Sequence, residues 1–334
     1  MAKVKLIDVA RFAGVSKSTA SQFLNGRFDY MSKETQERIR AAVAELDYVP
    51  NPIARNLKAT KTKTIGVVVR DITGFYSSRV IRGVDDYCKA KGYNALIYNT
   101  DFDPETEAKS IEALYQLRVD GVIIASSGNN TQLISGYIEK GMPIVHFQIE
   151  NDGSEQNIIL SDYKKAAFDA TEYLINLGHK RICFVTQDFN NVNSRIDRYQ
   201  GYAEALSKHD IPLDDNLVQR WDRESGFQTA PIEIIKSYAP TAFFTQHLPI
   251  TVELLRSLNR ANISVPDDVS LLGFDEVPMA EFFKVPITVV KQEPYSIGIE
   301  ASKLLLNNIA KETNISHKIL IPCSLEIRES CKKL

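Results

Sequence analysis

The side chains best suited to chemistry are not spaced for catalysis in this 334-residue chain. No glycine-rich phosphate loop, G-x-S-x-G elbow or H-x-x-x-H pair occurs, and the five histidines are scattered. Asp275 and Glu276 stand together as an acid–base pair would, but neighbouring residues of a strand point to opposite faces. The four cysteines form no C-x-x-C pair: Cys88, Cys183, Cys323 and Cys331. We therefore expect neither an enzyme nor a metal ion, disulfide framework or cofactor.

Side chains able to form hydrogen bonds gather instead on one face of a short helical pattern near the N-terminus. Lys17, Ser18, Ser21 and Gln22 share this face, and the apolar side chains between them form the opposite face. Such a helix fits the major groove of DNA, where base edges present distinguishable donors and acceptors. The pattern predicts a base-reading helix, although a plain three-helix bundle would show the same spacing.

Two further helical patterns and a turn are placed to hold this helix. The first pattern, in residues 7–13, ends at Gly14, which can adopt a positive φ and close a tight turn. Ser16 can then cap the polar helix by accepting backbone N–H bonds. A third pattern starts at Ser32 and directs Ile39 inward. Two short helices joined by a glycine turn predict a helix-turn-helix.

Charge is distributed unevenly, although the formal net charge is only −2. Residues 1–63 contain 12 lysines and arginines against 6 acidic residues, whereas the remainder contains 28 against 36. A basic head on an acidic body is expected when only one end of a protein meets nucleic-acid phosphates. The start of the sequence lacks the apolar stretch of a signal peptide, and no apolar run is long enough for a membrane span. We expect a cytoplasmic protein.

Beyond residue 63, short apolar segments alternate with amphipathic stretches. The strand-like segments are TIGVVV, YNALIY, GVIIAS, PIVHF, ICFV, TAFFT, VSLLGF and ITVV. This alternation predicts an α/β fold with parallel sheets covered by helices on both faces. The segment is too long for one such sheet, so we expect two lobes, with a ligand bound outside the carboxyl ends of the strands.

Longer strings resemble one known family. LIDVARFAGVSKSTASQFLN, YVPNPIARNLK, LGHKRICFV and VPDDVSLLGFDEVPMAEF are similar to segments of the lactose/galactose repressor (LacI/GalR) family, and the resemblance covers essentially the whole chain. It implies a three-helix helix-turn-helix head in residues 1–48 and a hinge helix or linker in 49–63. A two-lobed, periplasmic-binding-protein-like (type I) sensor with doubly wound parallel sheets would fill 64–334. The implied N-lobe contains about 64–162 and 291–320, and the C-lobe contains about 163–290 and 321–334.

The resemblance also assigns contacts with DNA in the head. It places Lys17, Ser18 and Gln22 at the base-reading positions of the second helix. Gln22 could pair bidentately with an adenine edge, whereas Lys17 favours the acceptors of guanine. Thr19 and Ser21 would contact phosphates or seat the helix.

The linker is expected to form a second contact. Pro50-Asn51-Pro52 stops the preceding helix, and the short helical pattern that follows is marginal in water without a partner. In the family, two such hinge helices pair in the minor groove. By resemblance, Leu57 is the wedge that enters a base step, and Arg55 and Lys58 contact phosphates. An ordinary linker is the alternative interpretation.

The resemblance assigns several ligand-binding residues in the sensor. Phe75 and Tyr76 would form an aromatic wall, and Trp221 would stack on a sugar ring. Asp275 would bind sugar hydroxyls, and Arg198 falls on the ligand-binding arginine of the family. Each has a plainer interpretation. Phe75 and Tyr76 could cap the core, Trp221 could pack at an interface, and Arg198 could form a salt bridge between the lobes.

Three more residues complete the predicted site. Arg195 lies one helical turn before Arg198, so the two arginines could grip a carboxylate. Gln148 and His247 are departures, since the family commonly has Asp-Arg and Asn-Asp where this chain has Gln148-Ile149 and His247-Leu248. These departures argue against a simple neutral hexose.

The resulting functional prediction is a homodimeric repressor of carbohydrate catabolism genes, bound to a pseudo-palindromic operator in double-stranded DNA. Its effector is a sugar or sugar acid, and the strings ITGFYSSRVIRGVDD and NSRIDRYQGY resemble the branch (KdgR/RegR-like) that controls the breakdown of uronate-containing polysaccharides and 2-keto-3-deoxygluconate. The alternatives are a purine-like or phosphoprotein corepressor and a sugar-binding protein without a DNA role. Dimer and tetramer, and induction and corepression, stay open.

Overall fold

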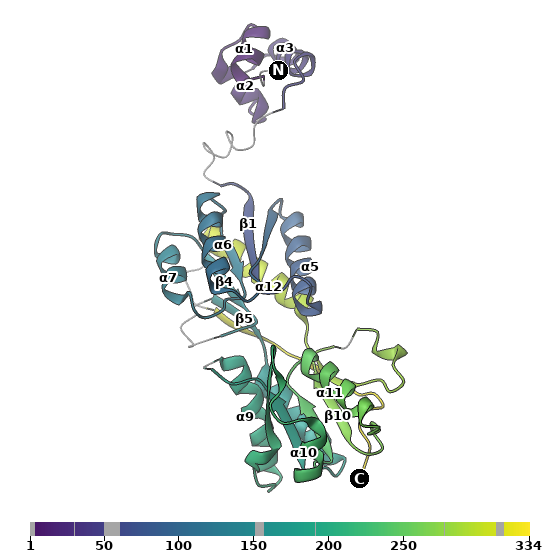
Figure 1. Cartoon of the computed structure of the whole chain (residues 1–334). Coiled ribbons are helices and arrows are strands. Elements are labelled where there is room, and N and C mark those ends of the chain that lie inside the picture. The colour runs from purple at the N-terminus through teal and green to yellow at the C-terminus, as the bar shows by residue number, and fades with distance from the viewer. Residues whose placement is uncertain are drawn as a thin grey trace. The chain divides into compact units, whose positions relative to one another are not determined.

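The computed structural model describes residues 4–29, 31–49, 61–150, 157–190, 192–276, 278–311 and 317–334. The chain divides into two compact units, residues 1–62 and 63–334 (Figure 1). Most of the predicted hinge, including Arg55, Leu57 and Lys58, lies outside the described residues. Among those described, no helix has the length and apolarity that a bilayer span requires.

The first unit is the predicted three-helix head. Its helices are α1 (Leu6–Phe12), α2 (Lys17–Leu24) and α3 (Lys33–Glu45). Gly14 has a φ of +62° in the turn before α2, which a residue with a Cβ rarely adopts. Val9, Ala20 and Ile39, one from each helix, are fully buried where the helices meet. The turn, cap and inward residues predicted from the sequence are therefore confirmed.

The N-lobe of the second unit contains a parallel six-stranded sheet in the order β12-β5-β4-β3-β1-β2. Its strands are β1 (Thr64–Val69), β2 (Asn94–Asn99), β3 (Val122–Ile124), β4 (Ile144–Phe147), β5 (Asn157–Ser161) and β12 (His317–Ile321). One face packs against α5 (Phe75–Ala90) and α12 (Pro294–Ala310), and the other against α6 (Pro104–Gln116) and α7 (Thr131–Glu139). The central strands are buried on both faces, which explains their continuous apolar runs.

The C-lobe contains a seven-stranded sheet in the order β13-β11-β10-β9-β6-β7-β8. Its strands are β6 (Ile182–Thr186), β7 (Val218–Asp222), β8 (Gly226–Phe227), β9 (Ala242–Thr245), β10 (Ser270–Phe274), β11 (Thr288–Lys291) and β13 (Ser324–Glu326). Helices α8 (Tyr163–Asn176) and α9 (Asn193–Lys208) cover one face, and α10 (Pro231–Tyr238) and α11 (Leu248–Arg260) cover the other. Short 3₁₀ turns cover Asp215–Leu217 and Ala280–Phe282. The edge strands β8 and β13 pair antiparallel, which the sequence pattern did not predict.

The chain crosses between the lobes three times. It leaves the N-lobe after β5, returns between β11 and α12, and crosses again between β12 and β13. Lys291 ends β11 in the C-lobe sheet and Ile321 ends β12 in the N-lobe sheet, because each extends the register of its neighbouring strand. The second and third crossings therefore follow Lys291 and Ile321.

Candidate functional site

The second helix of the head presents a polar surface of the predicted kind. Ser16 caps α2, since its hydroxyl accepts the backbone N–H of Thr19 at 3.0 Å. The side chains of Lys17, Ser18 and Gln22 are exposed, whereas Thr19 and Ser21 are half-buried. The three residues expected to contact bases are thus the exposed ones, and the two expected to contact phosphates or seat the helix lie closer to the body of the head.

Packing behind α2 holds that surface in place. Ala20 is fully buried against the other two helices. The ring of Phe23 meets that of Phe28 edge to face at 5.6 Å, and the guanidinium of Arg40 lies 5.9 Å from the Phe23 ring centroid. The reading face thus belongs to a helix whose opposite face is fixed by core contacts.

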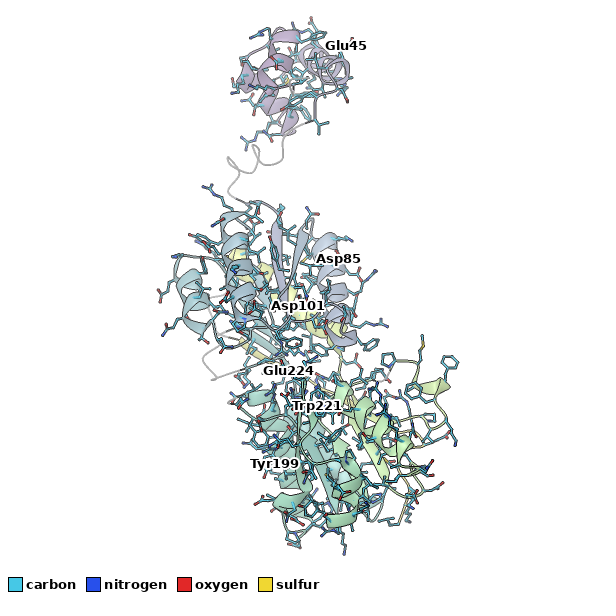
Figure 2. The ribbon with its side chains drawn as sticks, in the orientation of Figure 1. Glu45, Asp85, Asp101, Tyr199, Trp221 and Glu224 are labelled. Atoms are coloured by element: carbon cyan, nitrogen blue, oxygen red, sulfur yellow. The ribbon has the colours of Figure 1, made fainter. Side chains whose placement is uncertain are left out.

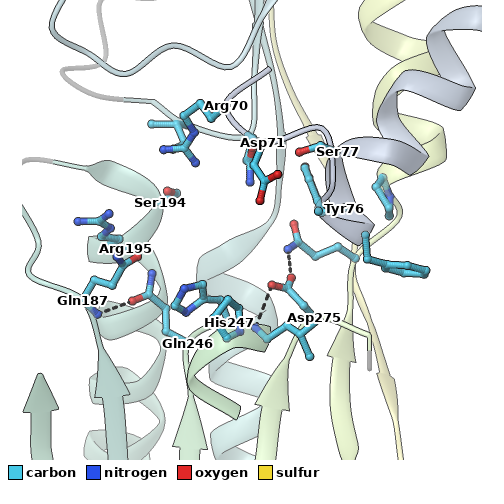
Figure 3. Close-up of a pocket in the computed structure, with 18 of the residues that line it drawn as sticks. Arg70, Asp71, Tyr76, Ser77, Gln187, Ser194, Arg195, Gln246, His247 and Asp275 are labelled. Atoms are coloured by element: carbon cyan, nitrogen blue, oxygen red, sulfur yellow. Dashed lines mark hydrogen bonds between the residues drawn. The ribbon is translucent and has the colours of Figure 1, made fainter. Parts of the chain in front are cut away.

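A second candidate site is a cavity of about 270 Å³ between the lobes of the sensor. Polar residues reach it at the carboxyl ends of strands, as expected for parallel α/β sheets. The residues that follow β1, β4, β6, β9, β10 and β11 and line the cavity include Arg70, Gln148, Gln187, Gln246, Asp275 and Gln292. Figure 3 shows Arg70, Asp71, Tyr76 and Ser77 facing Arg195, His247 and Asp275 across it.

The cavity collects most of the ligand residues predicted from the sequence. Seven of them line it: Phe75, Tyr76, Gln148, Arg195, Arg198, His247 and Asp275. Trp221 does not line it. Its indole N–H donates to Glu253 at 2.6 Å, and its ring packs edge to face on His247 with centroids 5.3 Å apart. The structure therefore places Trp221 behind His247, in the C-lobe core.

Arg198 is held in a fixed position on the C-lobe wall. Its guanidinium carbon lies 3.9 Å from the ring centroid of Tyr163 and 4.3 Å from that of Phe274, so the group is stacked between two aromatic faces. One of its terminal nitrogens donates to the carbonyl of Ser194 at 2.7 Å. Its Nε is buried and has no hydrogen-bond partner in the described part of the chain. This donor is available to a ligand.

His247 is the N-cap residue of α11 and places its ring beside the cavity. Both ring nitrogens are buried without a hydrogen-bond partner among the described residues. Burial lowers the pKa of His247 to about 3, and the positive charges of Arg198, Arg223, Arg195 and Arg70 contribute to this shift in that order. The imidazole is therefore neutral at physiological pH and offers one donor and one acceptor.

Asp275 lies near Arg198 and is organised by its neighbours. Its backbone has a φ of +79°, a left-handed conformation that is uncommon for a residue with a side chain. Its carboxylate accepts hydrogen bonds from the side chain of Gln292 and, at 3.4 Å, from the backbone of Leu248. Burial raises the pKa of Asp275 above its ordinary value. The adjacent Glu276 pairs instead with both oxygens to Arg328, at 2.9 and 3.0 Å, so no acid–base pair forms.

Sequence reasoning missed several residues of the cavity. Arg70 and Gln292 directly follow β1 and β11, and a systematic search of strand ends would have found them. Phe102 and Arg223 come from loops in different lobes, and no local pattern connects them. Tyr163 is the first residue of α8 and is almost fully buried, with its hydroxyl donating to the carbonyl of Gln148 at 2.9 Å.

The fold and the two sites define a class of protein, in which a DNA-reading head is joined to a two-lobed ligand-binding domain. The family model of bacterial regulatory proteins, lacI family, matches residues 5–51. The model of the periplasmic binding protein-like domain matches residues 171–331. Each match thus falls on the unit that the structure assigns to it.

Whole-chain comparisons identify the family. The chain is 32% identical over 333 residues to the probable HTH-type transcriptional regulator EndR of Paenibacillus polymyxa, covering 98% of both proteins. It is 32% identical over 342 residues to the HTH-type transcriptional repressor PurR of Vibrio parahaemolyticus, covering 100% of both. The chain belongs to the lacI family of bacterial regulatory proteins and is a DNA-binding transcriptional regulator.

A solved structure supports the same fold. The lac repressor dimer bound to operator and the anti-inducer ONPF matches with a TM-score of 0.85 and 23% identity, over 99% of this chain and 100% of the other. The relatives named above are transcriptional regulators rather than enzymes.

Proposed function

We propose that this chain is a homodimeric repressor of carbohydrate catabolism genes that releases its operator when a sugar acid binds between the lobes. A 2-keto-3-deoxygluconate or uronate-type compound is the first candidate for the effector. The head would read a pseudo-palindromic operator through Lys17, Ser18 and Gln22. Such a regulator would act in the bacterial cytoplasm, where its DNA is found.

One observation carries the assignment to an acidic ligand. The cavity is lined by Arg70, Arg195, Arg198 and Arg223, and within the described ranges none of these guanidinium groups forms a salt bridge. Guanidinium groups recognise carboxylates through paired, charge-assisted hydrogen bonds. A neutral sugar would leave this group of positive charges without a counterion.

The rest of the cavity suits the hydroxyl groups of a sugar. The carboxylate of Asp275, the amide of Gln148 and the buried hydroxyl of Tyr76 face it, and that hydroxyl has no partner among the described residues. Phe75 and Tyr76 offer aromatic rings to the apolar face of a sugar. The basic and hydroxyl-binding sides together favour a molecule with a carboxylate at one end and hydroxyls along the rest.

The DNA side of the proposal rests on the head and on the family. The matched lac repressor is a dimer bound to operator, and two heads on a two-fold axis would read two half-sites. The linker contacts expected for Arg55, Leu57 and Lys58 belong to this proposal. Effector binding would change the arrangement of the lobes, and the paired linkers would then lose their hold on the minor groove.

The test is operator binding by the full chain in the presence of candidate effectors. Fluorescence anisotropy with labelled operator would be measured with galacturonate, glucuronate and 2-keto-3-deoxygluconate, and with galactose, hypoxanthine and guanine as comparisons. We expect a sugar acid to weaken operator binding, with little effect of the neutral sugar. A purine that strengthens operator binding, with no response to any sugar acid, would replace this proposal by corepression.

A further inference from the structure

Three arginines from both lobes line one end of the cavity, and two of them contact a single aromatic ring. Arg70 follows β1 in the N-lobe, Arg195 lies on α9, and Arg223 stands in the turn between β7 and β8. The ring of Phe102, in the N-lobe loop after β2, lies 5.2 Å from the guanidinium of Arg70 and 4.2 Å from that of Arg223. In Figure 2, Asp101 and Glu224, the neighbours of Phe102 and Arg223, stand at the facing edges of the two lobes.

Local contacts position the segments that carry the three arginines. Arg195 donates to the backbone carbonyl of Asp188 at 2.5 Å. The turn that carries Arg223 is closed by the carboxylate of Asp222, which accepts the backbone N–H groups of Glu224 and Ser225 at 2.9 and 3.2 Å. The Nε of Arg70 is buried and has no hydrogen-bond partner in the described part of the chain. Within the described residues, none of the three guanidinium groups forms a salt bridge.

The nearby carboxylates form no salt bridge with these arginines among the described residues, and their oxygens accept hydrogen bonds from other groups. Glu107, whose charge acts on Arg70, accepts the backbone N–H of Ser127 at 2.7 Å. Asp71 accepts the backbone N–H and hydroxyl of Thr73 at 2.9 and 2.6 Å. Asp188 pairs with Arg220 at 3.4 Å, and its backbone carbonyl accepts the hydrogen bond from Arg195. Asp275 and Glu276 are bound by Gln292 and Arg328, respectively.

The three guanidinium groups repel one another at this end of the cavity. Burial lowers the pKa of Arg70 to about 10, with Arg195 and Arg223 adding repulsion. Like charges that approach in a partly buried site repel one another strongly, unless an anion lies between them. An anionic group of a ligand is the partner that this arrangement lacks.

We propose that Arg70, Arg195 and Arg223 form an anion clasp, in which one carboxylate, sulfate or phosphate group of the ligand is bound between the N-lobe guanidinium and the two C-lobe guanidiniums. Phe102 is the platform that keeps Arg70 and Arg223 on the same side of this group. The anion removes the repulsion between the lobes, so the charged group of the effector, more than its hydroxyls, stabilises their closed arrangement. This inference rests on the proposed function for the identity of the effector, but the clasp itself is defined for any such anion.

The direct probe is a simple oxyanion on the full chain. Selenate and sulfate would be titrated against chloride at matched ionic strength, with calorimetry and the fluorescence of Trp221, the single tryptophan, as readouts. We expect saturable binding, and anomalous density for selenate between Arg70 and Arg223 in crystals. Arg70→Gln and Arg223→Gln should each weaken binding about 10-fold or more, the scale of a lost charge-assisted hydrogen bond. Arg260→Gln, an exposed charge at the far end of α11, is the matched control and should leave binding unchanged.

A double-mutant cycle tests whether one anion joins the two lobes. If Arg70 and Arg223 bind the same group, the double variant should lose clearly less than the product of the two single losses. Galacturonate should show the same coupling, and its neutral methyl ester should show none. Since Arg223 is exposed, Arg223→Gln should fold normally even if Arg70→Gln does not.

The clasp is refuted if wild-type protein binds neither selenate nor sulfate saturably, if selenate lies away from Arg70, or if both glutamine variants behave like Arg260→Gln. Failure of the proposed function looks different. In that case oxyanions would bind through the three arginines, but no sugar acid would alter operator affinity. Conversely, if a sugar acid still releases the operator normally from the Arg70→Gln/Arg223→Gln protein, the proposed function is supported and the clasp is refuted.

Discussion

At the scale of single residues, His247 combines an unfavourable environment with an unused hydrogen-bonding capacity. Its ring is wedged between Trp221 and a cavity lined by arginines, and neither nitrogen has a partner among the described residues. Such a residue contributes little to the stability of the empty sensor, because burying polar nitrogens without hydrogen-bond partners costs free energy. We expect His247 to contribute to ligand binding, because a ligand can supply both a donor and an acceptor to its ring nitrogens.

The depressed pKa of His247 predicts a pH-dependent stability. Its pKa is about 3 in the folded chain and 6.5 for an unperturbed histidine side chain, so the unfolded chain binds the extra proton between these values. Stability is therefore lost as the pH falls below about 6.5, and the loss should reach about 2 kcal/mol at pH 5. Urea denaturation between pH 7.5 and pH 5 would measure it, with His247→Asn as the comparison that lacks the titrating group. Identical pH dependence of the two proteins would contradict the assignment.

Gln22 is the residue of α2 whose role is easiest to separate from general DNA affinity. Its side chain is exposed on the polar face, and the amide can pair with an adenine edge. Gln22→Ala should cost about 1–3 kcal/mol on the cognate operator and relax the preference at one base pair. Binding to a set of single-base operator variants would measure this. An equal loss on every sequence would assign Gln22 to phosphate contact instead.

The residues of the cavity differ in how far the sequence predicts them. Asp275 and Gln148 directly follow apolar strands, so the rule that ligands bind at carboxyl ends of strands already points to them. The sequence does not predict that Arg70 and Arg223 lie together, because both contact Phe102, which lies near neither of them in the sequence. For Trp221 the prediction is wrong. The resemblance implies contact with the ligand, whereas in the structure Trp221 donates a hydrogen bond to Glu253 in the C-lobe core.

At the scale of secondary-structure elements, close contacts between helices determine where the cavity residues stand. Helices α8 and α9 pack at Gly201, where an added Cβ would lie 2.2 Å from the carbonyl oxygen of Lys164. Gly201 lies three residues after Arg198 on α9. The position of the arginines therefore depends on a helix contact that only glycine permits.

Replacement of this glycine should affect both stability and ligand binding. Gly201→Ala must push α9 away from α8, and we expect a loss of about 1–3 kcal/mol in the free energy of unfolding, as for other overpacked sites. Effector affinity should fall as well, because Arg195 and Arg198 would move with the helix. Gly136→Ala on α7 is the matched control, since its Cβ would meet nothing within 4 Å. Helix propensity predicts a gain of about 0.5–1 kcal/mol there. Similar losses for both variants would exclude the packing explanation.

The elements themselves were predictable to different degrees for physical reasons. β1 and β10 are central strands buried on both faces, and their unbroken apolar sequences identified them. β13 is a short, partly exposed edge strand, and it becomes a strand only by pairing antiparallel with β11. Edge strands of this kind depend on a neighbour that lies far away in the sequence, so local sequence predicts them poorly.

At the scale of the whole molecule, the head and the sensor carry opposite net charges and should respond differently to salt. The basic residues 1–63 would bind DNA by displacing counterions, so operator affinity should fall steeply as the salt concentration rises. The effector would be held by arginines in a partly buried cavity, where screening by salt is weaker. Titrations of operator and of a sugar acid between about 50 and 200 mM salt should therefore give a much steeper slope for the operator. Equal slopes would place the effector on an exposed surface.

The two binding events must also be linked reciprocally. If a bound sugar acid weakens operator affinity by some factor, then bound operator must weaken sugar-acid affinity by the same factor. Calorimetric titration of the sugar acid into the free protein and into the protein–operator complex would measure the second factor, and anisotropy would measure the first. The clasp predicts that Arg223→Gln reduces both factors together, because a ligand that no longer joins the lobes distinguishes less between their arrangements. Equal effector affinity with and without operator would show that the cavity does not control DNA binding, whatever it holds.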